Sequence, residues 1–70
     1  MKISARNVLP GKIKEIKKGA TTSHVIIEAT SATLTAAITN ESVEDLGLKV
    51  GGVVKAIIKS SDVKIGRAHV

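Results

Sequence analysis

The chain has 70 residues, a formal net charge of +5, no cysteine and no aromatic residue. This length predicts a single domain over residues 1–70, which buries only about 60% of the surface that its unfolded form exposes. The missing cysteines exclude disulfides and thiolate metal sites, and the two histidines, His24 and His69, lie too far apart for a zinc motif. We therefore expect self-association to supply the missing stability.

The positive charge predicts an anionic partner, which can be a nucleic acid, an acidic membrane surface or a small oxyanion. Proteins that bind single strands combine a basic groove with aromatic side chains on which bases stack. Because this chain has no aromatic residue, that mode is disfavoured, while non-specific binding to phosphates stays open. No apolar run approaches the ~20 residues of a membrane span, and the N-terminus lacks the apolar stretch of a signal peptide. We therefore expect a cytoplasmic protein.

The N-terminal region predicts strands. Apolar and polar residues alternate over 2–9, and Pro10-Gly11 predicts a turn or a break. Ile13 and Ile16 have a helical spacing, but a helix this short would be poorly anchored. We therefore expect 12–18 to be a strand with a bulge between the two isoleucines, and its lysines to form a solvated face.

The middle of the chain predicts a hairpin followed by a short helix. Alternating patterns over 23–29 and 33–39 flank a turn at residues 30–32. His24 is expected on the strand surface rather than in a site. A helix over 40–46 can be capped by its Asn40 or Ser42, and Gly47 provides its C-terminal stop.

The last part predicts a strand over 53–59 with apolar residues on both faces, typical of a barrel wall that contacts a partner. Ser60-Ser61-Asp62 breaks this strand, 63–65 reads as a last short strand, and 66–70 as a tail. Five or six short strands with one short helix predict an all-β fold, a small OB-like Greek-key β-barrel.

Catalysis is not supported by the residue pattern. A nucleophile needs a base and an orienting group nearby, yet His24 lies in a predicted strand and His69 in the tail. Three of the six acidic residues crowd the short helix, where capping explains them. Gly51-Gly52 precedes a strand instead of a helix, so no phosphate loop is predicted. We expect a protein that is not an enzyme.

Three places suit an oxyanion, each with a simpler alternative. Ser4 and Arg6 share one strand face and combine a hydroxyl with a charged, planar donor, although Arg6 alone can be a solvated surface residue. Thr39 and Ser42 lie at a strand-to-helix junction, where helix amides bind anions but where the same residues can simply cap the helix. Lys59-Ser60 can be a strand end in solvent.

Taken together, Ser4-Ala5-Arg6-Asn7, Ile38-Thr39-Asn40-Glu41-Ser42-Val43 and Ile58-Lys59-Ser60-Ser61-Asp62-Val63 resemble the motifs of the molbindins. These are free-standing molybdate-binding proteins of the Mop type, and the resemblance runs through the chain in order. It implies an OB-like barrel assembled as a hexamer, a trimer of dimers, with oxyanion sites between subunits. A second class of site near the three-fold axis is also implied, without assigned residues.

The resemblance implies a composite site, with Ser4, Arg6, Lys59 and Ser60 from one subunit and Thr39 and Ser42 from its neighbour. Molybdate is a tetrahedral dianion whose metal is already surrounded by oxygen, so it needs hydrogen-bond donors and no direct metal ligands. The expected function is the binding of molybdate or tungstate for storage or homeostasis, without an organic cofactor. The alternatives are an OB-type nucleic-acid binder and a non-catalytic assembly module.

Overall fold

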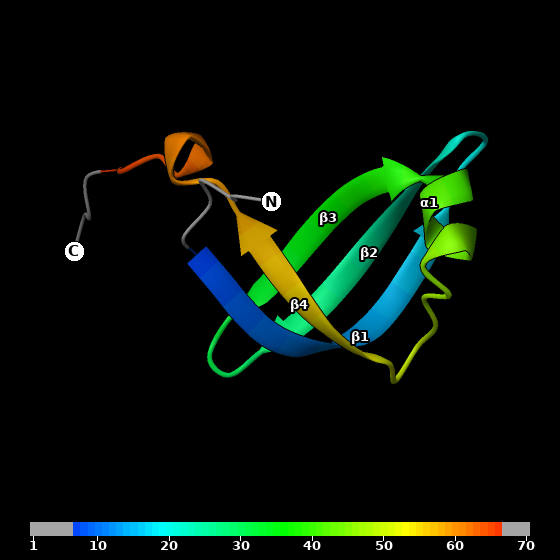
Figure 1. Cartoon of the computed structure of the whole chain (residues 1–70), viewed down its shortest axis with the longest axis horizontal. Helices are drawn as coiled ribbons and strands as arrows, with labels where there is room; N and C mark the ends of the chain where they lie inside the picture. Colours follow the sequence, from blue (N-terminus) through cyan, green and yellow to red (C-terminus); the bar gives the residue numbers. More distant parts are fainter. Residues whose placement is uncertain (1–6, 67–70) are drawn as a thin grey trace.

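The computed structural model describes residues 7–66, which form a curled antiparallel sheet with a short helix at one end (Figure 1). The strand order is β3-β2-β1-β4, so β3 and β4 are the edges. The elements are β1 (Asn7–Lys18), β2 (Thr22–Ala29), β3 (Thr33–Thr39), α1 (Asn40–Asp45), β4 (Val53–Ile58) and the 3₁₀ helix η1 (Ser60–Asp62). The predicted all-β fold with one short helix is confirmed. Neither α1 nor η1 has the length and apolar character that crossing a membrane requires.

Strand β1 is the longest element and joins the two halves of the sheet. It runs without a break through Pro10-Gly11, so the turn or break predicted there is wrong. Residues 7–9 and 12–18, predicted as parts of two strands, belong to this one strand. Pro10 pairs only with Lys55 of β4, because pairing with β2 starts at Gly11. Proline, which has no backbone donor, is tolerated where a strand has a neighbour on one side only.

A β-bulge interrupts the pairing of β1 with β2. Ile13 lies opposite Ile27, but Glu15 lies opposite Ile26, so Lys14 is an extra residue on β1. The bulge predicted between the two isoleucines is confirmed. An extra residue bends a strand and increases its twist, which helps β1 to pair with β4 at its start and with β2 at its end.

Gly11 lies where β1 passes from one neighbour to the other. A Cβ atom added there would lie 2.7 Å from the backbone oxygen of Glu28 and 2.8 Å from Cγ2 of Ile27. We expect Gly11→Ala to lower the free energy of unfolding by about 2 kcal/mol, measured by urea denaturation, because a backbone atom cannot yield cheaply. Gly66→Ala, whose Cβ would meet nothing within 4 Å, should be almost neutral. Equal stability of the two variants would contradict the close approach.

The core of the single chain is thin. Only Ile13, Val25 and Ile27 are buried apolar residues within 7–66. The inward residues of β3 and β4 are partly buried and pack against them: Leu34, Ala36, Ile38, Val54 and Ala56. The two edge strands line an apolar groove of about 510 Å³, so the curled sheet does not close around a sealed interior.

The C-terminal end follows the prediction in its strand and departs from it afterwards. The predicted strand over 53–59 is present as β4, and the face expected to contact a partner is exposed in the single chain, where Val53 is 77% and Ile57 55% exposed. Residues 63–65, predicted as a strand, follow η1 outside the sheet, and Ile65 is 97% exposed. Residues 7–66 form four strands instead of five or six. The described parts of the first two predicted strands are one continuous β1, and η1 turns the chain away from the edge strand β4 (Figure 1). Most of the predicted tail lies outside the described residues.

Helix α1 ends at the glycine that the sequence predicts. Gly47 has φ 65°, a left-handed conformation that glycine adopts without a Cβ clash. Its N–H donates to the Glu44 carbonyl at 3.0 Å, and the N–H of Leu48 donates to the Val43 carbonyl at 3.0 Å. This pair of bonds is a Schellman motif, which satisfies the last carbonyls of a helix.

Candidate functional site

Thr39 and Ser42, two predicted site residues, are bonded to each other at the start of α1. Thr39 Oγ1 accepts the N–H of Ser42 at 3.0 Å and donates to Ser42 Oγ at 2.8 Å. Thr39 is therefore the N-cap, as the simpler alternative for this junction has it, and the prediction that Asn40 or Ser42 caps the helix is wrong. Because the Thr39 proton is used within the pair, the hydroxyl that remains able to donate to a ligand is that of Ser42.

Two of the first three amides of α1 are already engaged. The N–H of Asn40 donates to the Thr21 carbonyl at 2.9 Å, and that of Ser42 to Thr39. The helix spans six residues, too few for a strong aligned dipole. The expected contribution of helix amides to an oxyanion site is therefore small, and the Ser42 hydroxyl is the useful side-chain donor.

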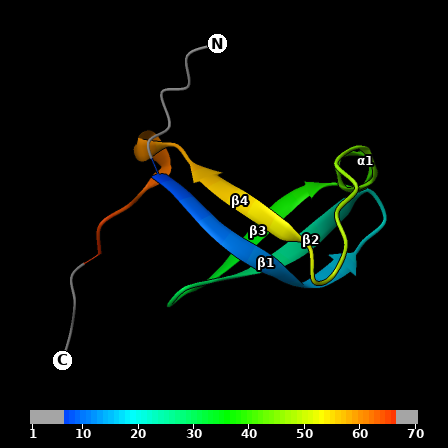
Figure 2. The same cartoon turned by 60° about the horizontal axis from the view of Figure 1, so that its bottom comes forward.

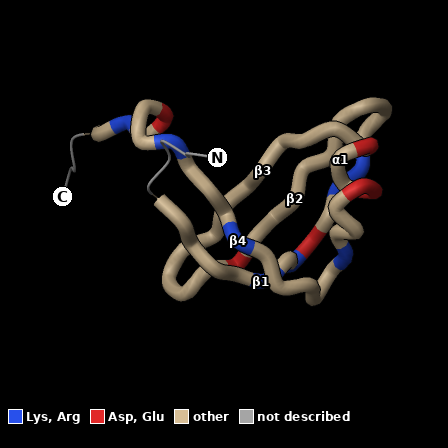
Figure 3. Tube along the Cα trace, viewed as in Figure 1, with Lys and Arg blue, Asp and Glu red and all other residues tan. Residues whose placement is uncertain are grey.

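The helix that carries this hydroxyl pair is acidic. Three of the six acidic residues of the chain lie in α1, where Figure 3 shows red segments: Glu41, Glu44 and Asp45. The last turn of α1 has no basic residue. A dianion placed against α1 alone would be repelled, because like charges at short range disfavour each other. The cations for such a ligand must come from elsewhere.

Lys59 and Ser60, two further predicted site residues, lie at the junction of β4 and η1. Lys59 is the N-cap residue of η1, with φ −62° and ψ 138°, and its side chain makes no capping hydrogen bond. Backbone bonds hold the turn, including one of 2.9 Å from the N–H of Asp62 to the Lys59 carbonyl. Both side chains are exposed, so this junction presents an ammonium and a hydroxyl to solvent.

Ser4 and Arg6 lie outside the described residues, but their neighbour Asn7 is the first residue of β1. Asn7 is the register partner of Ile58, and its Nδ2 donates to the Ile58 carbonyl at 3.2 Å. Arg6 precedes Asn7 in the sequence, and Lys59 follows Ile58. The two motifs are thus continuous with the same end of the β1–β4 ladder.

The two described groups of site residues lie far apart within one chain. Helix α1 and η1 are at opposite ends of the molecule in both views (Figures 1 and 2), and its longest dimension is 37 Å. A single small oxyanion cannot touch Ser42 and Lys59 of the same chain. The structure brings Thr39 together with Ser42, and Lys59 with Ser60, but it does not bring these pairs together.

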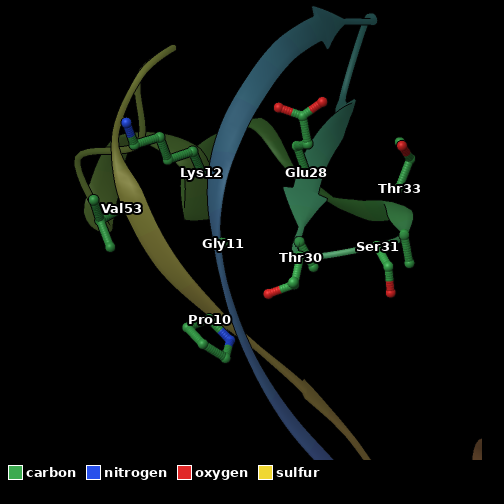
Figure 4. Close-up of a pocket in the computed structure, with 10 residues that line it drawn as sticks. Pro10, Gly11, Lys12, Glu28, Thr30, Ser31, Thr33 and Val53 are labelled. Carbon is green, nitrogen blue, oxygen red and sulfur yellow. The ribbon is translucent and has the colours of Figure 1, made fainter.

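Two other hollows contain none of the predicted site residues. The larger, of about 640 Å³, lies at the β2–β3 turn. Its Lys12 and Glu28 are register partners on β1 and β2, and Figure 4 shows their side chains pointing in different directions. The smaller, of about 410 Å³, is lined by Lys17, Lys18 and His24. Within residues 7–66, no group of three or more His, Cys, Asp or Glu side chains could hold a metal ion.

The chain matches the TOBE domain family over residues 3–65. It is 48% identical over 66 residues to molybdenum-pterin-binding protein 3 of Clostridium pasteurianum. This match covers 93% of this chain and 97% of that protein. The family match over residues 3–65 includes all three sequence motifs.

Solved structures agree with this match. A molybdate binding protein from Sporomusa ovata is similar with a TM-score of 0.89 and 39% identity, over 96% of this chain and 100% of that chain. ModG, described as a cytoplasmic molybdate-binding protein and solved with molybdate bound, is similar with a TM-score of 0.80 and 38% identity, over 86% of this chain and 43% of that chain. The resemblance noted in the sequence is confirmed: the chain belongs to the TOBE domain family, as a nearly full-length relative of the molybdenum-pterin-binding proteins.

Proposed function

We propose that this protein binds molybdate by hydrogen bonds and ion pairs, at sites shared between the subunits of a homo-oligomer. One subunit contributes Ser4, Arg6, Lys59 and Ser60, and its neighbour contributes Thr39 and Ser42. The family supports the ligand, since relatives along the whole chain are named for molybdenum or molybdate binding. The proposal is for capture and release of the anion without catalysis.

The separation of the two half-sites is the observation on which the shared site rests. In one chain, the hydroxyl pair on acidic α1 and the Lys59–Ser60 junction lie at opposite ends (Figure 1). Each is incomplete for a dianion by itself: α1 carries no basic residue, and the Lys59–Ser60 junction lacks the hydroxyl pair. A neighbouring subunit that places its Lys59 and Arg6 beside α1 supplies two positive charges for the two negative ones, which offsets the large cost of taking a dianion out of water.

A hexamer, arranged as a trimer of dimers, is the assembly that we propose from the family resemblance. The exposed apolar residues support an assembled form. Val8 and Ile57 are register partners on the outer face of the β1–β4 ladder, 49% and 55% exposed, and Val53 is 77% exposed. Burying such residues against a second subunit provides the apolar burial that the thin core lacks.

The proposed role is storage or homeostasis of molybdenum in the cytoplasm. A protein that only captures an oxyanion suits this role because release needs no chemical step. Tungstate has the same charge and tetrahedral shape, so we propose that it binds at the same sites. The cytoplasmic location follows that described for ModG.

Calorimetric titration with molybdate, tungstate and sulfate tests the function. We expect molybdate and tungstate to bind and to raise the melting temperature of the oligomer, because a ligand at 100 times its Kd stabilises the folded form by about 2.7 kcal/mol. Sulfate is the matched control, being a tetrahedral dianion of smaller size. Native mass spectrometry of the same samples reports the number of subunits.

A parallel titration with a single-stranded oligonucleotide separates the proposal from nucleic-acid binding. If the oligonucleotide binds and neither molybdate nor tungstate does, the proposed function is wrong. If no ligand binds and a stable oligomer is present, the chain is an assembly module instead.

A further inference from the structure

Ser23 is the one buried polar residue among residues 7–66, with 1% of its surface exposed. It lies on the inner face of β2, in line with the buried Val25 and Ile27. A hydroxyl at such a position is costly unless it is hydrogen-bonded. Its Oγ donates to Oδ1 of Asn40. A core position of β2 is therefore occupied by a hydroxyl that bonds the Asn40 side chain instead of by an apolar side chain.

Asn40 also donates three hydrogen bonds to the neighbouring turn. Its Nδ2 donates to the carbonyls of Gly19 and Ala20, at 3.0 and 3.3 Å, and its backbone N–H donates to the carbonyl of Thr21 at 2.9 Å. One residue thus binds three consecutive carbonyls of the β1–β2 turn. The amide has a defined orientation, because its oxygen would face two carbonyls if it were turned over.

The result of these bonds is a fixed start for α1. Asn40 is the first residue of the helix, directly after Thr39 and two positions before Ser42. With its side chain held by β2 and the turn, the helix cannot rotate about its axis or shift along it without breaking several bonds. The direction of the Ser42 hydroxyl, which the N-cap Thr39 also bonds, therefore depends on Asn40.

We infer that Asn40, held by the buried Ser23, is the positioning residue of the Thr39–Ser42 half-site: it contacts no ligand, but it sets where the Ser42 hydroxyl points. This inference rests on the proposed function, since Ser42 is taken as a donor to molybdate. The site then has two layers, the Ser42 donor and the Asn40 and Ser23 side chains behind it. Such support is what gives a binding group a defined position.

Three variants test this inference by molybdate calorimetry. Asn40→Ala should weaken molybdate binding about tenfold, the effect of losing one good hydrogen bond to a charged group. Ser23→Ala should act in the same direction, and the Ser23→Ala/Asn40→Ala double variant should lose no more affinity than Asn40→Ala alone, because the two residues work as one unit. Ile27→Val, a core change elsewhere on β2, is the control that lowers stability without changing affinity.

The decisive comparison is Asn40→Ala in a Ser42→Ala background. If Asn40 acts through Ser42, removing Asn40 there should change affinity by less than twofold, while its effect on the melting temperature remains. In the ligand-free protein, Asn40→Ala should also speed hydrogen exchange of the Ser42 amide, which measures the position of the helix start without molybdate.

Two results would contradict the inference, and they differ from failure of the proposed function. An Asn40→Ala protein that melts earlier but binds molybdate as tightly as the wild type would make Asn40 purely structural. A full tenfold loss in the Ser42→Ala background would mean that Asn40 acts on another part of the site. A wild-type protein that binds no molybdate, by contrast, overturns the function itself and this inference with it.

Discussion

Arg6→Ala is expected to lower molybdate affinity by about 100-fold or more. Arg6 and Lys59 are the two cations of the proposed site, and the dianion needs both for neutrality. Removing one partner of a desolvated, hydrogen-bonded charge pair costs about 2–5 kcal/mol, and each 1.4 kcal/mol is about tenfold in affinity. Calorimetric titration of the assembled variant with molybdate measures the effect.

Arg6→Lys separates charge from geometry. Lysine keeps the positive charge but loses the planar pair of donors that suits an oxyanion. We therefore expect the molybdate affinity of Arg6→Lys to lie between that of the wild type and that of Arg6→Ala. Arg67→Ala, which removes the same side chain outside the three motifs, is the matched control and should bind like the wild type. If Arg6→Ala binds molybdate as tightly as Arg67→Ala does, Arg6 is a solvated surface residue, the alternative that the sequence left open.

Ile57→Glu is expected to break the assembly and to abolish molybdate binding at the same time. Ile57 lies on the outer face of β4, opposite Val8 on β1, and a carboxylate buried in an apolar interface without a partner is very costly. If the half-sites come from different subunits, a separated chain has no complete site. Native mass spectrometry should show smaller species, and calorimetry should show no molybdate binding by them.

Two controls accompany this variant. Ile57→Val keeps an apolar side chain and should preserve both assembly and binding. Thr30→Glu adds the same charge at the exposed β2–β3 turn and should also preserve them. A dissociated Ile57→Glu chain that still binds molybdate tightly would contradict the shared site, whereas a fully assembled one would place the subunit interface elsewhere.

Much of the local structure could be predicted because it follows from short-range patterns. The hairpin over 23–29 and 33–39, the bulge near Ile13 and the helix stop at Gly47 each depend on a few neighbouring residues. The turn predicted at Pro10-Gly11 is wrong because local turn propensity is outweighed by the pairing of β1 with β4 and, from Gly11 on, with β2. The structure tolerates this proline where β1 has one partner, and it uses the glycine where two backbones approach closely.

The candidate site, too, could be predicted from the sequence only in part. Its residue types could be found from the sequence, because Thr39, Ser42, Lys59 and Ser60 lie at the ends of predicted elements, where polar groups are left without partners. The roles of Ser23 and Asn40 could not be found, although a serine on the inward face of an apolar strand was a signal. Their bond joins residues 17 positions apart, and only the folded sheet shows it.

The sequence by itself determined the all-β class, the basic character, the three motifs and the family, because composition, strand periodicity and motif spacing are properties of the chain alone. The tertiary structure decided three things that no local pattern contains. It joined the N-terminal strands into one continuous β1, it bonded Asn40 to the buried Ser23 and to the β1–β2 turn, and it placed α1 and η1 at opposite ends. The physical reason is that each depends on contacts between distant segments, which exist only once the sheet has curled.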